Sequence, residues 1–320
     1  MSLFTLDDTA LIRLFAHWHV PVPATDLVLF ALRGAVPVTP ATGDTHGANG
    51  ADGSEWTRRA TLALVTPDHI HMRCTLGIWN RATQRLFVAR GSTVPHRDQV
   101  LKAAARTGVM KGRGTNQLEP GFYTDLTKGE HLQGKPQGHA ALRQTGFRFY
   151  RRAHLADRAH ENRHTVNGGP LYTAGDPLFF GNPYDNLHCA WNIDPEAPGF
   201  RSAGCLVVAG WPHSPRLPDA SPNRGAWKTF HDLIYAAPQQ TFPLLLLPAE
   251  EAAAALAAPA TADATAEPAL LYGSAGEAVK ALQRRLAARK AYTGRINGRL
   301  GAATYRAWKR QRRDDTRPEP

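Results

Sequence analysis

The chain has 320 residues, of which 38 are Lys or Arg, 27 are Asp or Glu and 42% are hydrophobic. This apolar fraction is typical of a globular protein and excludes disorder over the whole chain. Three cysteines are too few for a dense disulfide framework. The longest apolar runs are far shorter than the ~20 residues of a membrane helix, so we expect no insertion into a membrane. Acidic residues come early, at Asp7 and Asp8, and no basic region precedes a long apolar stretch, so no Sec-type signal peptide is expected.

The net charge of +11 is concentrated near the C-terminus. Residues 271–320 carry 13 Lys and Arg against 4 Asp and Glu, a net charge of +9, whereas residues 1–270 carry only +2. A local basic surface attracts polyanions, among them nucleic acids and the carboxylates and phosphates of a bacterial cell wall. No nucleic-acid-binding motif is present in the sequence, so we expect no nucleic-acid partner.

Strand patterns dominate the first 248 residues. Residues 74–90 form two alternating apolar runs around a polar turn, which predicts a hairpin. Further strands are predicted at 121–126, 146–151, 206–210 and 242–247, and helices at 7–17, 98–107 and 225–235. This balance predicts a mostly β domain with a few helices.

Composition divides the chain near residue 249. The segment 249–268 is rich in Ala, contains two prolines and lacks aromatic residues, which predicts a linker whose first part is helical. The predicted organisation is residues 1–69 as an N-terminal extension or part of the main β domain, 70–248 as the main β domain, 249–268 as the linker, 269–314 as a small all-α domain and 315–320 as a tail.

The segment 269–314 begins with a helix-capping pattern. Ser274 is followed three residues later by Glu277, and an apolar stripe at helical spacing comes next. The order G-S-x-G-x-x-V-x-x-L-Q-x-x-L, then Y-x-G-x-x-x-G-x-x-G-x-x-T, resembles the three-helix peptidoglycan-binding domain found beside many wall-lytic enzymes. The resemblance implies a small all-α module of three helices that binds peptidoglycan. The substrate-binding residues that it implies are Tyr292, Asn297 and Trp308.

Cys205 has the sequence setting of a nucleophile. Ser202, Ala203 and Gly204 precede it and an apolar strand follows. Such small neighbours leave room for a substrate, and backbone N–H groups at the turn are placed to hold an oxyanion. A thiol also needs a base or an imidazolium partner near neutral pH. His188, on a predicted neighbouring strand, is the candidate base.

The spacing H-x13-S-x-G-C, from His188 to Cys205, resembles the catalytic signature of L,D-transpeptidases of the YkuD-like fold. Residues 114–123 (GTNQLEPGFY) resemble a further segment of that family. Ala203 stands where the family has a second His, and Leu206 and Val207 stand where it has polar residues. The resemblance implies an L,D-transpeptidase-like catalytic domain over residues 70–248, and no cofactor.

The family resemblance also implies a role for each residue. Cys205 would attack the carbonyl of the third residue of a peptidoglycan stem peptide, and His188 would carry the proton. The Gly204 carbonyl or the Ser202 hydroxyl would orient the imidazole. An amine acceptor gives transpeptidation, whereas water gives carboxypeptidase or endopeptidase action, and the sequence does not distinguish these outcomes.

The cysteines leave two alternatives open. Cys205 could be an ordinary core cysteine beside a half-buried histidine. Cys189 directly follows His188 and would point to the opposite face of a strand. A disulfide between Cys189 and Cys205 would silence the nucleophile.

A metal site is the runner-up hypothesis. Residues His160, Glu161 and His164 match H-E-x-x-H, the pattern that places two zinc ligands and a base on one helical face. The surrounding residues are charged throughout, which favours a solvated segment over a zincin helix. This alternative predicts a zinc-dependent peptidoglycan hydrolase.

The sequence therefore predicts a cysteine-dependent enzyme that acts on peptidoglycan, with a wall-binding module that raises the local substrate concentration. The site of action would be the periplasm or cell wall. Without a Sec signal, delivery would use a secretion machine, as for an antibacterial effector with an immunity protein, or phage lysis. The other alternative is a catalytically inactive wall-binding protein.

Overall fold

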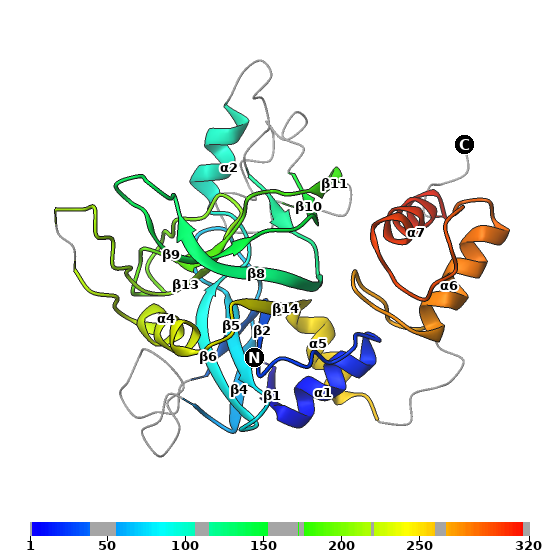
Figure 1. The fold of residues 1–320 in the computed structure, drawn as a ribbon, viewed down its shortest axis with the longest axis horizontal. Helices are drawn as coiled ribbons and strands as arrows, with labels where there is room; N and C mark the ends of the chain where they lie inside the picture. Colours follow the sequence, from blue (N-terminus) through cyan, green and yellow to red (C-terminus); the bar gives the residue numbers. More distant parts are fainter. Residues whose placement is uncertain are drawn as a thin grey trace.

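The computed structural model describes residues 2–38, 56–105, 115–152, 172, 176–218, 221–259 and 267–315. These residues form one closed barrel, two small sheets and six helices (Figure 1). No helix within the described ranges has both the length and the apolar character needed to cross a membrane.

Eight strands close the barrel in the order β12-β13-β6-β5-β2-β14-β8-β9. Their bounds are β2 Leu27–Arg33, β5 Cys74–Asn80, β6 Arg85–Ser92, β8 Gly121–His131, β9 His139–Gln144, β12 Leu187–Cys189, β13 Leu206–Val208 and β14 Thr241–Pro248. The pairs β14–β2 and β12–β13 are parallel, and the other pairs are antiparallel. Alternate side chains of all eight strands fill the barrel interior, and the apolar face of α4 (Ala226–Ala236) packs against them.

The hairpin predicted at 74–90 is confirmed as β5 and β6, which pair in register from Cys74 opposite Gly91 to Asn80 opposite Arg85. The strands predicted at 121–126, 146–151, 206–210 and 242–247 are also confirmed, as β8, β10 (Arg148–Arg151), β13 and β14. The three predicted helices are present as α1 (Asp8–His17), α2 (Arg97–Ala104) and α4.

A second apolar layer covers the outer face of β2, β5, β6 and β14. It consists of α1, α5 (Ala249–Ala257) and the sheet β1-β4-β3, whose strands are Leu3–Asp7, Arg59–Leu64 and Ala35–Pro37. The described part of residues 1–69 thus supplies most of this layer and one barrel strand, β2. The start of the predicted linker is the helix α5, and Ala249 and Ala252 are buried in this layer.

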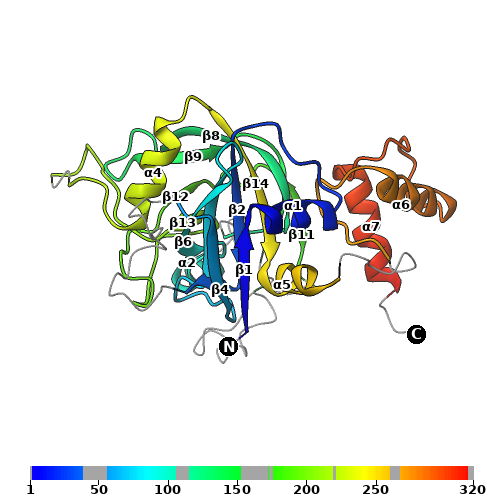
Figure 2. The same ribbon diagram turned by 90° about the horizontal axis from the view of Figure 1, so that it is seen from below.

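The predicted fold class is wrong in its architecture, although the mostly β character holds. The described C-terminal segment has two helices, α6 (Glu277–Ala288) and α7 (Ala302–Asp315), and not three. They lie together at one end of the molecule (Figures 1 and 2). The molecule is an eight-stranded closed barrel with helices distributed around it, rather than an L,D-transpeptidase-like domain followed by a separate all-α module.

The C-terminal helices share their core with the body of the protein. Phe149 of β10 belongs to the same buried cluster as α6 and α7, and Phe180 of β11 (Leu178–Gly181) packs against that cluster. Backbone hydrogen bonds also connect the C-terminal segment to the barrel. The Phe122 N–H, in β8, donates to the Tyr272 carbonyl at 2.7 Å. The C-terminal helices share this core because two helices in about 45 residues are too small to enclose a hydrophobic core without another surface.

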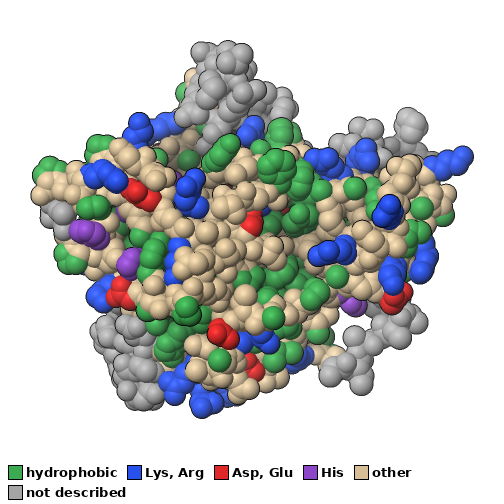
Figure 3. All heavy atoms as spheres, viewed as in Figure 1, with side chains coloured by type: hydrophobic (Ala, Val, Ile, Leu, Met, Phe, Trp, Pro, Cys, Tyr) green, Lys and Arg blue, Asp and Glu red, His purple; other side chains and the backbone are tan. Residues whose placement is uncertain are grey.

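The surface of the C-terminal helices is basic, as the charge distribution predicts. Figure 3 shows Lys and Arg side chains gathered over α6 and α7. The exposed residues are Arg284, Arg285, Arg289, Lys290, Arg295, Arg299, Arg306, Arg310 and Arg312. This face of the molecule is suited to an anionic surface or polymer.

Candidate functional site

The strand β12 places His188, the candidate base, on the outer face of the barrel. Leu187 and Cys189 point into the barrel interior, so His188 between them points outward. Because β12 pairs in parallel with β13, the residues just before the two strands lie side by side. Asn186 and Cys205 are these residues, and the backbone N–H of Asn186 donates to the Cys205 Sγ at 3.3 Å.

A tight turn presents Cys205 at the start of β13. The Ser202 hydroxyl donates to the Cys205 carbonyl at 2.7 Å and accepts the Gly204 N–H at 3.1 Å. Gly204 has φ of +143°, a conformation that L side chains rarely adopt. The small residues ahead of Cys205 are therefore needed to form the turn itself. Ser202 holds the turn and not the imidazole, so the orienting role implied for its hydroxyl does not match its hydrogen bonds.

Two segments that are distant in sequence hold this turn from outside. The backbone N–H of His96 donates to the Ser202 carbonyl at 2.8 Å, and that of Asn116 donates to the Ala203 carbonyl at 3.1 Å. Asn116 belongs to the GTNQLEPGFY segment that the sequence singled out. The structure thus brings that segment, His188 and Cys205 together.

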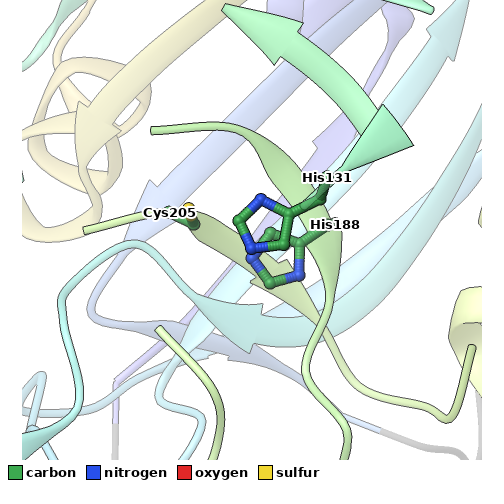
Figure 4. Close-up of side chains that lie close together, drawn as sticks. All are labelled: His131, His188 and Cys205. Carbon is green, nitrogen blue, oxygen red and sulfur yellow. The ribbon is translucent and has the colours of Figure 1, made fainter. Parts of the chain in front are cut away.

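Three imidazoles surround the outer face of β12. His131 ends β8 and His139 begins β9, and these two residues lie opposite each other in the ladder. One ring nitrogen of His131, one of His188 and the Cys205 sulfur all lie within 4.8 Å of one another. Figure 4 shows the His131 and His188 rings stacked beside Cys205. Their centroids are 4.1 Å apart and their planes differ by 12°.

The hydrogen bonds fix the tautomer of His188. Its Nδ1 lies 2.7 Å from the Cys189 carbonyl oxygen, which can only accept, so Nδ1 carries the proton. The same N–H faces Nε2 of His139 at 3.3 Å, and Nδ1 of His139 donates to the Gln137 carbonyl at 2.8 Å. Nε2 of His188 is therefore the unprotonated nitrogen. It is the Cys189 carbonyl, and not that of Gly204, that orients this ring.

The tautomer of His131 is the opposite one. Nδ2 of Asn186 donates to His131 Nδ1 at 3.0 Å. The orientation of the Asn186 amide is set by its Oδ1, which accepts the Gln144 N–H at 3.2 Å. His131 therefore carries its proton on Nε2. The cluster holds one imidazole that can accept a proton and one that can donate a hydrogen bond.

Burial keeps these rings neutral. Desolvation lowers the pKa of His188 well below its usual range, and the neighbouring His131 and His139 lower it further. Burial also lowers the pKa of His139, and it lowers the pKa of His131 to about 4. At neutral pH the cluster therefore holds uncharged imidazoles.

The thiol is also neutral. Burial raises the pKa of Cys205, and the nearby Asp185 carboxyl raises it further. The backbone N–H groups of Asn186 and Cys205 act in the opposite direction but do not outweigh burial. Asp185 itself is buried and accepts from Asn116 Nδ2 at 3.1 Å, and desolvation raises its pKa to about 8. The resting pair is a thiol and a neutral imidazole, not a thiolate and an imidazolium.

The site is closed in this structure. Cys205 is 6% exposed and His188 is 2% exposed. A pocket of about 330 Å³ lies on the His139 side of the cluster, between Glu130, Arg216 and His231. A substrate can reach the sulfur only if neighbouring segments move, and catalytic hydrogen bonds commonly tighten only when substrate is bound.

The three ligand-type residues do not fit a metal ion as they are placed. A metal–nitrogen bond of about 2 Å lies in the plane of its imidazole ring. The rings of His131 and His188 are nearly parallel and stacked, so their in-plane lone pairs cannot meet at one ion. The Asn186 amide also occupies Nδ1 of His131. The arrangement suits proton transfer better than metal binding.

Cys189 behaves as the strand alternation predicts. It lies in the barrel core, whereas Cys205 packs in a separate outer cluster with Phe200 and Val207. All three cysteines are free, so no disulfide joins Cys189 and Cys205. The alternative in which a disulfide silences the thiol is excluded by this geometry.

The other predicted residues lie apart from the cluster. Tyr292 and Trp308 are each 9% exposed and pack in the C-terminal core. Asn297 is exposed, and its Oδ1 accepts from Gln283 Nε2 at 3.0 Å. Their binding role stays a prediction. The H-E-x-x-H residues His160, Glu161 and His164 lie outside the described residues.

Sequence reasoning missed His131, His139, Asn186 and Asp185. Asn186 was within reach, because it stands two residues before His188 and shares its face of the strand. His131 and His139 gave no such signal, since only the pairing of β8, β9 and β12 brings them to His188.

Comparison with protein-family models, curated proteins and solved structures finds no match for this chain.

Proposed function

We propose that this protein is a cysteine-dependent acyltransferase or peptidase that acts on peptidoglycan stem peptides. The observation that carries the proposal is the Cys205 thiol, which lies on a preformed turn with its sulfur within 4.8 Å of a ring nitrogen of His188. A thiol and a base in this relation are the minimal machinery of nucleophilic acyl transfer.

In the first step the Cys205 sulfur attacks an amide carbonyl of the stem peptide while His188 Nε2 takes the thiol proton. The tetrahedral intermediate collapses, its C–N bond breaks, and the leaving amine takes the proton from His188. The product is a thioester on Cys205. An amine or water then attacks the thioester while His188 takes a proton from it; the C–S bond breaks, and His188 gives that proton to the departing sulfur.

The neutral resting state of the Cys205 thiol and the His188 imidazole determines when the proton is transferred. Because the pKa of Cys205 is raised and that of His188 is lowered, a preformed ion pair is disfavoured. Proton transfer must then accompany attack, with His188 acting as a general base. This differs from cysteine enzymes that hold a thiolate before substrate binds.

Two features support peptidoglycan as the substrate. The motif order in residues 273–304 resembles peptidoglycan-binding domains, and the exposed face of α6 and α7 is basic. Stem peptides carry carboxylates, which such a face attracts. The proposed place of action is accordingly the cell wall.

The test uses purified sacculi and mass spectrometry of the released muropeptides. The wild-type protein is expected to change the stem peptides, and Cys205→Ala is expected to bind sacculi but leave the muropeptides unchanged. Cys189→Ala is the matched control, because that thiol faces the barrel core.

Three outcomes would contradict the proposal. Full turnover by Cys205→Ala excludes the thiol mechanism. Chelator sensitivity combined with indifference to thiol alkylation favours the zinc hydrolase instead. Wall binding without turnover in any variant favours an inactive wall-binding protein.

A further inference from the structure

We propose that His131 is a second catalytic residue, whose Nε2–H donates to the substrate carbonyl oxygen as negative charge develops on it. This inference rests on the proposed function, because it assigns the oxyanion donor of the same reaction. His131 is contributed by β8, outside the motif that carries His188 and Cys205.

His131 carries a hydrogen-bond donor on Nε2. Asn186 Nδ2 donates to Nδ1 of His131 and thereby leaves the proton on Nε2. Because Nδ1 is occupied and the ring stays neutral, His131 is poorly placed to act as the base. A fixed N–H that is already oriented costs no reorganisation during the reaction, which is the property of an effective oxyanion donor.

Two backbone donors beside the Cys205 sulfur are already engaged. The Gly204 N–H donates to the Ser202 hydroxyl, and the Asn186 N–H donates to the Cys205 sulfur. A cysteine site of this kind needs at least one preorganised donor for the carbonyl oxygen. The side chain of Ala203, at the position where the resembled family has a His, carries no hydrogen-bond donor.

His131 also lies close to the reacting groups. One nitrogen of His131 lies within 4.8 Å of the Cys205 sulfur and of a His188 nitrogen. The His131 ring stacks on the His188 ring, which holds both rings in a fixed relation. His131 is half-buried whereas His188 is fully buried, so a substrate that enters from solvent meets His131 first.

The test separates thiol activation from oxyanion stabilisation. Alkylation of Cys205 by iodoacetamide needs the thiol and its base but develops no oxyanion, whereas stem-peptide turnover needs all three groups. The variant His131→Phe keeps an aromatic ring to stack on His188 but removes the N–H. The variant His131→Gln keeps a side-chain N–H donor, and His17→Phe on the exposed face of α1 is the surface control.

We expect His131→Phe to lower turnover by about 10²- to 10³-fold, as loss of one oxyanion donor does in other enzymes. Its alkylation rate should stay within about threefold of wild type, and His131→Gln should recover part of the turnover. Turnover of His131→Phe at the wild-type level would overturn the inference. Equal loss of turnover and alkylation would also overturn it, because His131 would then serve the thiol.

A measurement on the wild-type protein keeps the inference testable if His131→Phe does not fold. A stem-peptide aldehyde would form a hemithioacetal with Cys205, and its oxygen mimics the oxyanion. The His131 Nε2 proton should then shift strongly downfield in NMR spectra of ¹⁵N-histidine-labelled protein. An unchanged His131 Nε2 proton resonance in the adduct would overturn the inference. If neither the adduct nor turnover is observed, the proposed function itself is contradicted.

Discussion

The carboxyl group of Asp185 lies directly against the α-carbon of Gly204, so that a methyl group at that position would come within 2.6 Å of Oδ1. Gly204 immediately precedes the proposed nucleophile, and Asp185 precedes the strand that carries the base. This packing contact joins the two halves of the site in addition to the hydrogen bond from the Asn186 N–H to the Cys205 sulfur. It makes the turn sensitive to volume at residue 204 and to charge at residue 185.

Gly204→Ala should destabilise the protein by about 1–3 kcal/mol, because it adds backbone strain at φ of +143° and a clash with the Asp185 carboxyl. The measurement is urea denaturation. Gly199→Ala is the matched control, since Gly199 also has a positive φ, of +102°, but has no atom within 4 Å of the added methyl. An equal loss of unfolding free energy in the two variants would show that the contact with Asp185 does not contribute to the destabilisation.

Asp185→Asn should increase the reactivity of Cys205 only at alkaline pH. With its pKa raised to about 8, Asp185 is neutral at pH 6.5 and largely charged at pH 9, where the negative charge raises the thiol pKa. Removing that charge should speed alkylation roughly tenfold at pH 9, the effect of one pKa unit. The exposed Asp194→Asn is the control. An equal acceleration of Cys205 alkylation at pH 6.5 would contradict the raised pKa of Asp185.

The neutral thiol–imidazole pair predicts a distinctive pH profile for wild-type alkylation. Because burial raises the thiol pKa, the rate of reaction with iodoacetamide should keep rising beyond pH 9. A thiolate held by an imidazolium would instead give a plateau that begins near pH 4–6. Intact-mass kinetics across pH 5–10 would distinguish the two, and a low-pH plateau would refute the general-base assignment for His188.

Removal of residues 267–320 should destabilise the rest of the protein. The truncation uncovers Phe149 and removes the Tyr272 carbonyl that accepts from Phe122 N–H and the Ser274 hydroxyl that donates to the Trp18 carbonyl. The full chain should therefore unfold in one thermal transition, and the truncated chain should melt several degrees lower. Calorimetry that shows two separate transitions for the full chain would support an independent module instead.

The parts of the fold that the sequence predicts are those set by local pattern. Alternation identified the β5–β6 hairpin, and it correctly separated His188 from Cys189 across the two faces of β12. The small residues before Cys205 correctly indicated a tight turn. Each of these inferences depends only on residues that are neighbours in the chain.

The parts that the sequence did not predict depend on long-range pairing. Residues such as Tyr305 show that a helix has a buried face but not what covers it, and Phe149 of β10 proved to be the neighbour. This is why a self-contained module was predicted where a shared core exists. His131 reaches His188 only through the closure of the barrel, which no local pattern encodes.

The most direct test of the central claim is to trap the acyl-enzyme. Purified protein would be mixed with a soluble tetrapeptide stem, quenched in acid within seconds and analysed by intact mass and peptide fragmentation. A covalent stem-peptide adduct located on Cys205, labile to hydroxylamine and absent from Cys205→Ala, is the predicted result. Stem peptides that are cleaved or exchanged while no adduct forms on Cys205, under quench conditions that preserve a thioester, would contradict it.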